Sequence, residues 1–201
     1  MPNVIQRTAS GIKSIPLNDV NFDHRIVTIR GEITQESAFE FALALQHLNG
    51  VSDTEPITVL VNSPGGSIDA GLLIYDVIGS SPAPVRLVVL GTAYSMAALI
   101  FASGRHGRYM LPNSKLMLHE PLLGCPIEGN TSSIKTISDH LQATRDKINT
   151  ILAQHTGKTR KVIEDATKHD HYFTAKESVE FGLCDDIITF NELVKEEFDH
   201  E

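Results

Sequence analysis

Residues 57–80 of this chain read ITVLVNSPGGSIDAGLLIYDVIGS, and this stretch decides the fold class. Its first five residues are β-branched or aliphatic, which is typical of a strand buried on both faces. A turn follows at residues 62–66, and an amphipathic helical pattern then runs from residue 68 to residue 78. A buried strand that passes through a glycine-rich turn into a helix predicts a βαβ unit and a parallel sheet.

The same alternation extends on both sides of this unit. Residues 26–29 suit a strand and residues 37–48 a helix, while a further strand at 85–90, a helix from residue 95 and a strand at 115–118 follow it. We therefore expect a single α/β domain. A chain of 201 residues is long enough for one such domain with a full core and too short for two of ordinary size.

The two ends of the chain do not continue this alternation of strands and helices. The first 20 residues are polar and interrupted by Gly11 and Pro16, which predicts a mobile arm, with order beginning near Arg25. Near the other end, Thr174 and Glu177 form a capping-box pattern that opens a short helix, and a last strand is expected at residues 187–189.

A long helix is predicted after Pro126. Apolar residues recur there at helical spacing over more than five turns: Ile134, Ile137, Leu141, Ile148, Ile151 and Leu152. A helix of that length can project from a compact body, and its apolar stripe then needs another helix or another subunit to cover it. Oligomerisation is therefore expected.

Bulk properties exclude several classes of function. The net charge is −8, from 17 basic and 25 acidic residues, which disfavours binding to nucleic acid or to an anionic membrane. No apolar run reaches the ~18 residues of a membrane span, and the N-terminus lacks a signal-peptide core, so a cytoplasmic location is expected. Cys125 and Cys184 are too few for a disulfide framework and suit reduced, structural thiols.

Ser95 is a candidate nucleophile. The sequence GTAYSMAA at residues 91–98 places it between a buried strand and a helix, where free N–H groups favour developing negative charge. A serine at this position also suits a simple helix cap, so Ser95 alone decides nothing. The α/β-hydrolase pattern G-x-S-x-G is excluded, because Ala93 and Ala97 stand at the glycine positions.

The paired glycines Gly65 and Gly66 allow backbone N–H groups to approach a ligand without side-chain obstruction. An oxyanion hole is one use of such a turn. A tight connection between strand and helix is the other, and the two are compatible.

Two further residues complete a possible triad. His119 follows the apolar run KLML, at the end of a strand, and Asp170 lies just before the capped helix at Thr174. Because an acid can orient a histidine and stabilise its imidazolium form, the pair suits the other two triad roles. Ordinary surface, structural or capping roles remain open for each residue taken alone.

Metal and phosphate sites are weaker interpretations. His169 and His171 form a His-x-His pair, but no further ligands stand near them, so no metal or cofactor is expected. A phosphate-binding loop ending at Lys158 and Thr159 is excluded, because Leu152 occupies the position of its first glycine.

Taken together, three segments closely resemble the ClpP peptidases: NSPGG after a strand, G-x-A-x-S-M-A around Ser95, and L-P-N-S-x-x-M-x-H-x-P around His119. The resemblance implies the crotonase-like ββα spiral, an α/β fold with a strand-helix handle. Residues 1–20 would then be an axial arm, residues 21–190 one peptidase domain with its handle at about 120–155, and residues 191–201 an acidic tail.

The resemblance also implies a mechanism and an assembly. Ser95, His119 and Asp170 would form the catalytic triad, and the N–H groups of Gly66 and Met96 the oxyanion hole. Substrate would lie extended between two segments, which comprise Ser67, Ile68 and Asp69 on one side and Leu122, Leu123, Gly124 and Cys125 on the other. Two stacked heptameric rings would enclose a chamber in which unfolded proteins are cleaved, fed by a separate AAA+ Clp ATPase.

Three departures from the family pattern mark a divergent paralogue. Lys168 and His169 replace an aspartate-arginine pair that serves ring contact. Thr58, Leu60 and Ser80 replace aromatic residues of the pocket that docks the ATPase. Glu120 replaces a glutamine, and the turn at residues 124–129 is about two residues longer. These departures keep open a latent or regulatory subunit that acts in mixed rings with a more typical paralogue.

A second alternative is an acyl-CoA enzyme of the crotonase superfamily, which shares the fold and the paired N–H groups. The Ser95-Met96 and His119-Glu120-Pro121 sequences argue against it.

Overall fold

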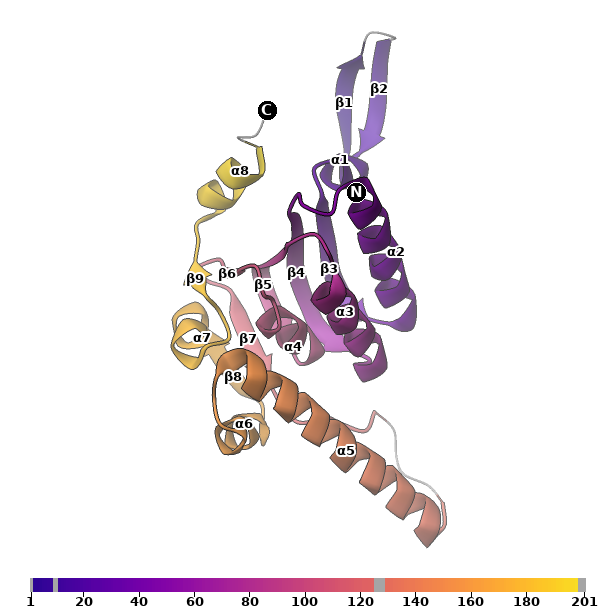
Figure 1. Ribbon diagram of the computed structural model, residues 1–201, viewed down its shortest axis with the longest axis vertical. Coiled ribbons are helices and arrows are strands. Elements are labelled where there is room, and N and C mark those ends of the chain that lie inside the picture. Colours follow the sequence, from indigo (N-terminus) through magenta and orange to yellow (C-terminus); the bar gives the residue numbers. More distant parts are fainter. Residues whose placement is uncertain (1, 9–10, 125–128, 199–201) are drawn as a thin grey trace.

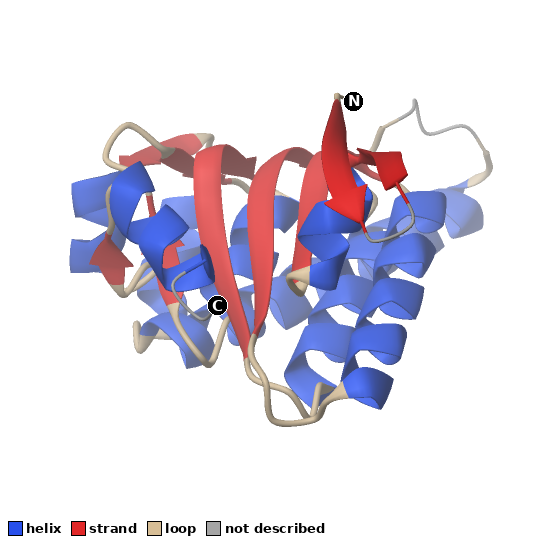
Figure 2. Ribbon diagram, turned by 90° about the horizontal axis from the view of Figure 1, so that it is seen from above, coloured by secondary structure: helices blue, strands red, loops and turns tan. Residues whose placement is uncertain are grey.

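The computed structural model describes residues 2–8, 11–124 and 129–198. Its main feature is a seven-stranded sheet, of which five strands lie in the order β3-β4-β5-β6-β9 and run parallel. These strands are β3 (Ile26–Ile33), β4 (Ile57–Gly66), β5 (Val85–Tyr94), β6 (Arg108–Met110) and β9 (Asp186–Ile187). Figure 2 shows the strands side by side, with helices packed around them.

The sheet divides along β5. The middle of β5, at Leu87 to Val89, pairs with β6, whereas its end, at Thr92 to Tyr94, pairs with β7 (Lys115–Leu118). The last strand, β8 (His171–Thr174), runs antiparallel to β7. The ends of β5 and β7 and the start of β8 therefore lie next to one another at one end of the sheet.

Helices follow the strands in βαβ succession. They are α2 (Gln35–Val51) after β3, α3 (Ile68–Ser80) after β4 and α4 (Met96–Ala102) after β5. On α2 the buried residues Ala38, Phe41, Leu45 and Leu48 recur every three or four positions, as one face of a helix requires. Every residue of α4 is buried. The α/β class and the parallel sheet expected from the sequence are confirmed, and the succession is consistent with the family's spiral.

Arg25 joins α2 to the sheet. It is only 9% exposed and has a φ of 59°, and its guanidinium donates hydrogen bonds to the carbonyl oxygens of Leu48, Ser52, Glu55 and Pro56. Leu48 lies in the last turn of α2 and also accepts from the Ser52 N–H, whereas Ser52, Glu55 and Pro56 lie beyond the end of the helix. The buried charge is thus satisfied entirely by backbone oxygens.

The N-terminal segment has regular structure. Strands β1 (Asn3–Thr8) and β2 (Gly11–Pro16) form an antiparallel hairpin, and α1 (Leu17–Asp23) leads from it to the sheet. The expectation that order begins near Arg25 is therefore wrong. Among the described strands, β1 and β2 pair only with each other, and the hairpin stands away from the main sheet (Figure 1). Its Ile5 and Ile12 are both exposed, so no alternation of buried and exposed residues marks these strands in the sequence.

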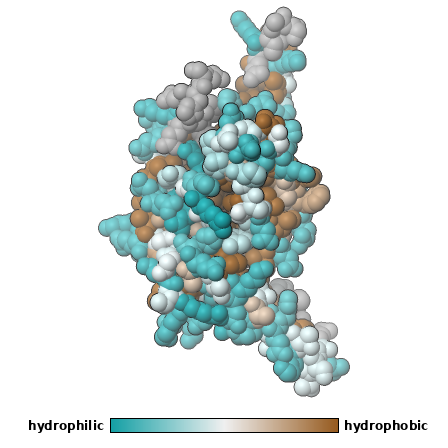
Figure 3. All heavy atoms as spheres, in the orientation of Figure 1, coloured by the Kyte–Doolittle hydropathy of each residue, from teal (hydrophilic) through white to brown (hydrophobic). Residues whose placement is uncertain are grey.

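The long helix is confirmed as α5 (Thr131–Thr156), which Asn130 caps. Its second half packs on the core through Ile148, Ile151 and Leu152, whereas Ile134 near its start is 43% exposed. The first half projects from the body in Figure 1, and mainly hydrophilic and neutral residues cover its free end in Figure 3.

The strand expected after His119 as half of the handle does not form in the described part of that segment, and residues 125–128 lie outside the described residues. The described residues 119–124 between β7 and α5 form no strand. A strand needs a neighbour for its backbone hydrogen bonds, and this segment pairs with no strand of its own chain among those described.

The C-terminal region also differs from expectation. Helices α6 (Arg160–Thr167) and α7 (Ala175–Phe181) follow α5, and α7 begins at the predicted capping box of Thr174 and Glu177. The last strand comprises only residues 186–187, and α8 (Phe190–Phe198) occupies the segment expected to be a tail. Leu193 of α8 is buried against Val88 and Ile188.

Within the described residues, no helix combines the length and apolar character that crossing a membrane requires.

Candidate active site

Three strands bring the candidate catalytic residues together. Ser95 directly follows β5, His119 directly follows β7, and Asp170 directly precedes β8. Because β7 pairs with both β5 and β8, the three side chains meet at one end of the sheet. This end of a parallel sheet is where α/β proteins place their reactive groups.

The distances suit proton transfer. The Nε2 atom of His119 lies 2.8 Å from the Oγ atom of Ser95, and its Nδ1 atom lies 3.3 Å from Oδ1 of Asp170. The side chain of His119 is 17% exposed, whereas that of Asp170 is 58% exposed. The Nε2 atom can therefore accept the serine proton while the Nδ1 atom is held by the Asp170 carboxylate.

The backbone of Ser95 is unusual. Its φ of 55° and ψ of −124° lie in a region that residues other than glycine rarely occupy. It stands at the N-cap position of α4, but its side chain makes no capping hydrogen bond, so the interpretation of Ser95 as a simple cap is wrong. The Ser95 N–H donates to the Met117 carbonyl at 2.8 Å, which fixes the turn and leaves the hydroxyl to face His119.

The glycine turn after β4 packs directly on Ser95. A Cβ atom on Gly65 would lie 2.7 Å from the Tyr94 carbonyl oxygen and 2.8 Å from the Ser95 Cβ atom. A Cβ atom on Gly66 would lie 2.3 Å from the Ile33 carbonyl oxygen. Both glycines have positive φ, so the turn needs them for its conformation as well as for the close approach.

A cavity of about 260 Å³ opens beside the serine and histidine. Gly66 and Met96, the expected oxyanion-hole residues, both line it. Because Met96 is the first residue of α4, its N–H is among the groups that have no partner within the helix. The cavity is otherwise mainly apolar, with walls that include Ile68, Leu99, Leu122, Ile148 and Leu152.

A model of the Clp protease family matches residues 12–191. The chain belongs to the Clp protease family. An ATP-dependent Clp protease proteolytic subunit of Leuconostoc citreum (strain KM20) is 36% identical over 189 residues, 94% of each chain. A protein of the same description from Ligilactobacillus salivarius (strain UCC118) is 34% identical over 196 residues, 97% of this chain and 98% of that one. The resemblance drawn from the motifs is confirmed.

Some of the residues expected to bind the peptide line the cavity, and the others do not. Ile68 and Leu122 line the cavity, whereas Ser67 and Asp69 form the cap and first turn of α3, and Cys125 lies outside the described residues. Leu123 and Gly124 are exposed beyond the cavity lining. The Ser67 N–H already donates to the Ile33 carbonyl, so this N–H is not available to pair with a peptide.

Sequence reasoning missed the contribution of α5. Ile148 and Leu152 supply one wall of the cavity, and Arg145, one turn earlier, pairs with Glu120 at 3.2 Å. This ion pair ties the residue after His119 to the long helix. The apolar spacing of residues 148 and 152 was visible in the sequence, but it does not say which surface they contact.

The structure offers no metal centre among the residues it describes, where no group of three or more His, Cys, Asp and Glu side chains comes together. His171 instead stacks on Phe173, with ring centroids 4.2 Å apart. Burial raises the pKa of the Cys184 thiol to about 12, which suits an inert structural thiol.

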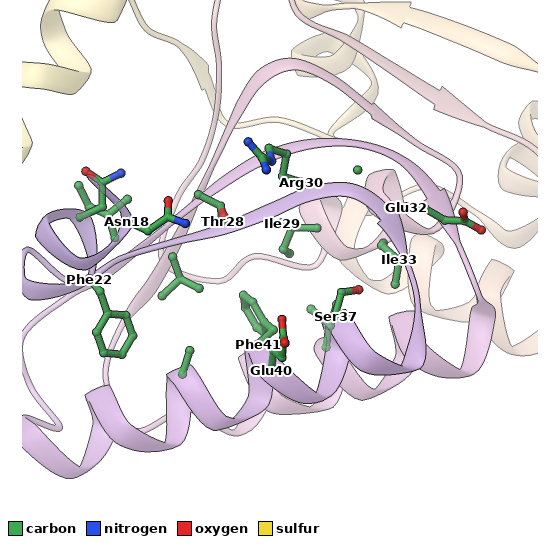
Figure 4. A pocket seen from close by; sticks show the side chains of 16 residues that line it. Asn18, Phe22, Thr28, Ile29, Arg30, Glu32, Ile33, Ser37, Glu40 and Phe41 are labelled. Atoms are coloured by element: carbon green, nitrogen blue, oxygen red, sulfur yellow. The ribbon is translucent and has the colours of Figure 1, made fainter. Parts of the chain in front are cut away.

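A second hollow, of about 330 Å³, lies away from the serine (Figure 4). It follows β3, the edge strand of the sheet, and the side chains of Ser37, Glu40 and Phe41 on α2 face it. Its lining contains none of the candidate catalytic residues.

Proposed function

We propose that the chain is a serine endopeptidase that hydrolyses peptide bonds of unfolded proteins. The observation that carries the proposal is the chain of contacts from Ser95 through His119 to Asp170, at 2.8 and 3.3 Å, beside an apolar cavity. Membership of the Clp protease family supports the same chemistry.

The roles follow from the geometry. His119 takes the proton of Ser95 as the hydroxyl oxygen attacks the peptide carbonyl, and Asp170 holds the imidazole in the required tautomer. The protonated His119 then donates to the leaving amine, and an acyl-enzyme remains. His119 next removes a proton from a water molecule as its oxygen attacks the ester carbonyl. It then returns this proton to the Ser95 oxygen as the ester bond breaks and the carboxylic acid product leaves.

Two N–H groups are proposed to stabilise the oxyanion. Those of Gly66 and Met96 come from the walls on either side of Ser95. A donor of this kind contributes about 3 kcal/mol to transition-state stabilisation in comparable enzymes. The positive φ of Ser95 supports its role as the nucleophile, because its hydroxyl makes no capping bond and lies against His119 instead.

We further propose that the chain works in two stacked seven-membered rings supplied by an AAA+ Clp ATPase. The relatives are described as proteolytic subunits of an ATP-dependent protease, and this chain has no nucleotide-binding motif of its own. The Gly157-Lys158-Thr159 stretch is a helix junction, in which Gly157 ends α5 and Thr159 caps α6. The exposed Ile134 on the projecting half of α5 suits a contact between subunits.

The proposal is tested by peptide hydrolysis. A short fluorogenic peptide should be cleaved by the wild type and not by Ser95→Ala. Asp170→Asn should lower turnover strongly while it preserves the fold, since the corresponding change costs about 10⁴-fold in the best-studied triad. Full activity of either variant at unchanged native mass contradicts the assignment.

A latent or regulatory subunit is the second candidate function. Lys168 and His169 are exposed beside Asp170, which leaves both side chains accessible to a neighbouring subunit in an assembly. Hydrolysis and native mass should be measured for the chain alone, and then after mixing with a paralogue whose own serine is alanine. A rise only in a mixed particle supports latency, and strong activity of the isolated chain as a two-ring particle excludes it.

A further inference from the structure

An aromatic contact links the strands that carry Ser95 and Asp170. The rings of Tyr94 and Tyr172 meet edge to face, with centroids 5.6 Å apart and planes at 89°. Tyr94 is the residue immediately before Ser95, and Tyr172 is two residues after Asp170. This geometry is one that aromatic pairs prefer.

The contact reaches across a whole strand. In the sheet register, Tyr94 of β5 lies opposite Met117 of β7, and Met117 lies opposite Tyr172 of β8. The three residues thus form one row across three strands, with the two rings meeting over the middle one. Met117 is 8% exposed. The row runs one residue before Ser95 and two residues away from His119 and Asp170.

Strand β8 needs such support because it is short and lies at the edge of the sheet. It has four residues and, among the described strands, pairs only with β7. Its Phe173 is buried in the core, whereas Tyr172 is 53% exposed and points to the other face. Among the described residues, the Tyr94 ring is the aromatic partner of Tyr172 on this face of β8. Asp170, two residues before Tyr172, is more than half exposed.

We propose that Tyr94 and Tyr172 form an aromatic clamp that positions Asp170 against His119. The inference rests on the proposed function and adds two positioning residues to it. Neither tyrosine lines the catalytic cavity, so the clamp acts through the carboxylate and not through the peptide. It holds the third member of the triad, whose 3.3 Å contact with His119 is the longer of the two.

The experiment uses Tyr94→Ala and Tyr172→Leu in the full chain, with Phe190→Ala as a control that removes another exposed aromatic ring. Peptide hydrolysis is measured on particles of unchanged native mass and melting behaviour. Each clamp variant should lower kcat roughly 10- to 100-fold with little change in KM, since small misplacement of a catalytic group has effects of that size. Tyr94→Phe and Tyr172→Phe keep the rings and should retain activity.

The deciding comparison places each change in an Asp170→Asn background. If the clamp acts through the carboxylate, Tyr172→Leu should lower kcat in the wild type and have little further effect once Asp170 is asparagine. Equal losses in both backgrounds, or wild-type activity of both clamp variants, overturn the inference while the triad stands. An Asp170→Asn variant with full activity instead overturns the proposed function.

Discussion

Gly65 and Ser95 lie so close together that a single added methyl group on Gly65 would stand 2.8 Å from the Ser95 Cβ atom. The close approach joins the end of β4 to the turn that carries the serine. The conformation of Gly65, with a φ of 94°, also disfavours any other residue.

Gly65→Ala is therefore expected to displace Ser95. Because a small misplacement of a catalytic group lowers the rate strongly, peptide hydrolysis should fall at least about tenfold. Gly50→Ala is the matched control, since Gly50 lies in α2 with nothing near its added Cβ. That change should leave activity intact and raise helix stability by up to about 1 kcal/mol. Equal activity of the two variants contradicts the account of the turn.

Arg25→Met should destabilise the fold by about 2–4 kcal/mol, because it removes a charged donor and leaves several carbonyl oxygens without it. Urea unfolding measures the change, with Arg105→Met as an exposed control that should differ little from the wild type. A loss of about 0.5 kcal/mol or less, as at an exposed site, would mean that the carbonyls of Ser52 and Glu55 find other partners.

The free energy of unfolding should decrease as the pH is lowered from about 7 to about 5, because of His155. Burial first, and then Arg105 and Arg108, hold the pKa of His155 below its ordinary value. The unfolded chain therefore binds more protons at this site than the folded one, and acid favours unfolding from about pH 6.5 downward. His155→Gln, which keeps a group able to bond to the Tyr75 hydroxyl, should flatten this part of the profile. An unchanged slope in thermal melts excludes His155 as its source.

The ion pair between Arg145 and Glu120 should add little stability. Both side chains are 39% exposed, and pairs of that kind are typically worth about 0.2–1 kcal/mol. A double-mutant cycle with Arg145→Met and Glu120→Gln should therefore give a coupling within this range in urea unfolding. A coupling of several kcal/mol would show that the pair is a main link between α5 and the sheet.

Local sequence patterns predicted the elements whose structure depends on residues close together in the sequence. The strand and turn at residues 57–66, the helix start at Ser95 and the capping box at Thr174 each depend on neighbours in sequence, so they could be seen without a structure. The candidate triad residues needed more than local pattern, because each alone also suited an ordinary role, and the resemblance of three motifs to the ClpP peptidases singled them out. The strand β8 that follows Asp170 was not predicted.

Other features depend on contacts between distant segments. Nothing near Leu193 shows that it packs on Val88, about half the chain away. Thr189 and Glu192 differ, because their reciprocal hydrogen bonds at the start of α8 form a local capping box that the sequence pattern could have predicted. The cavity wall from Ile148 and the contact of Tyr94 with Tyr172 likewise arise only when the strands and α5 are placed together. The strand expected after His119 has no partner strand within the described chain.

The central claim is that the Ser95 hydroxyl is the nucleophile, activated by His119 at 2.8 Å. The most direct measurement is the reaction of the full chain with a fluorophosphonate probe, followed by mass mapping of the modified residue. The account predicts a single covalent adduct on Ser95, lost in Ser95→Ala and much slower in His119→Ala. Labelling of another residue at the same rate in wild type and Ser95→Ala would contradict it.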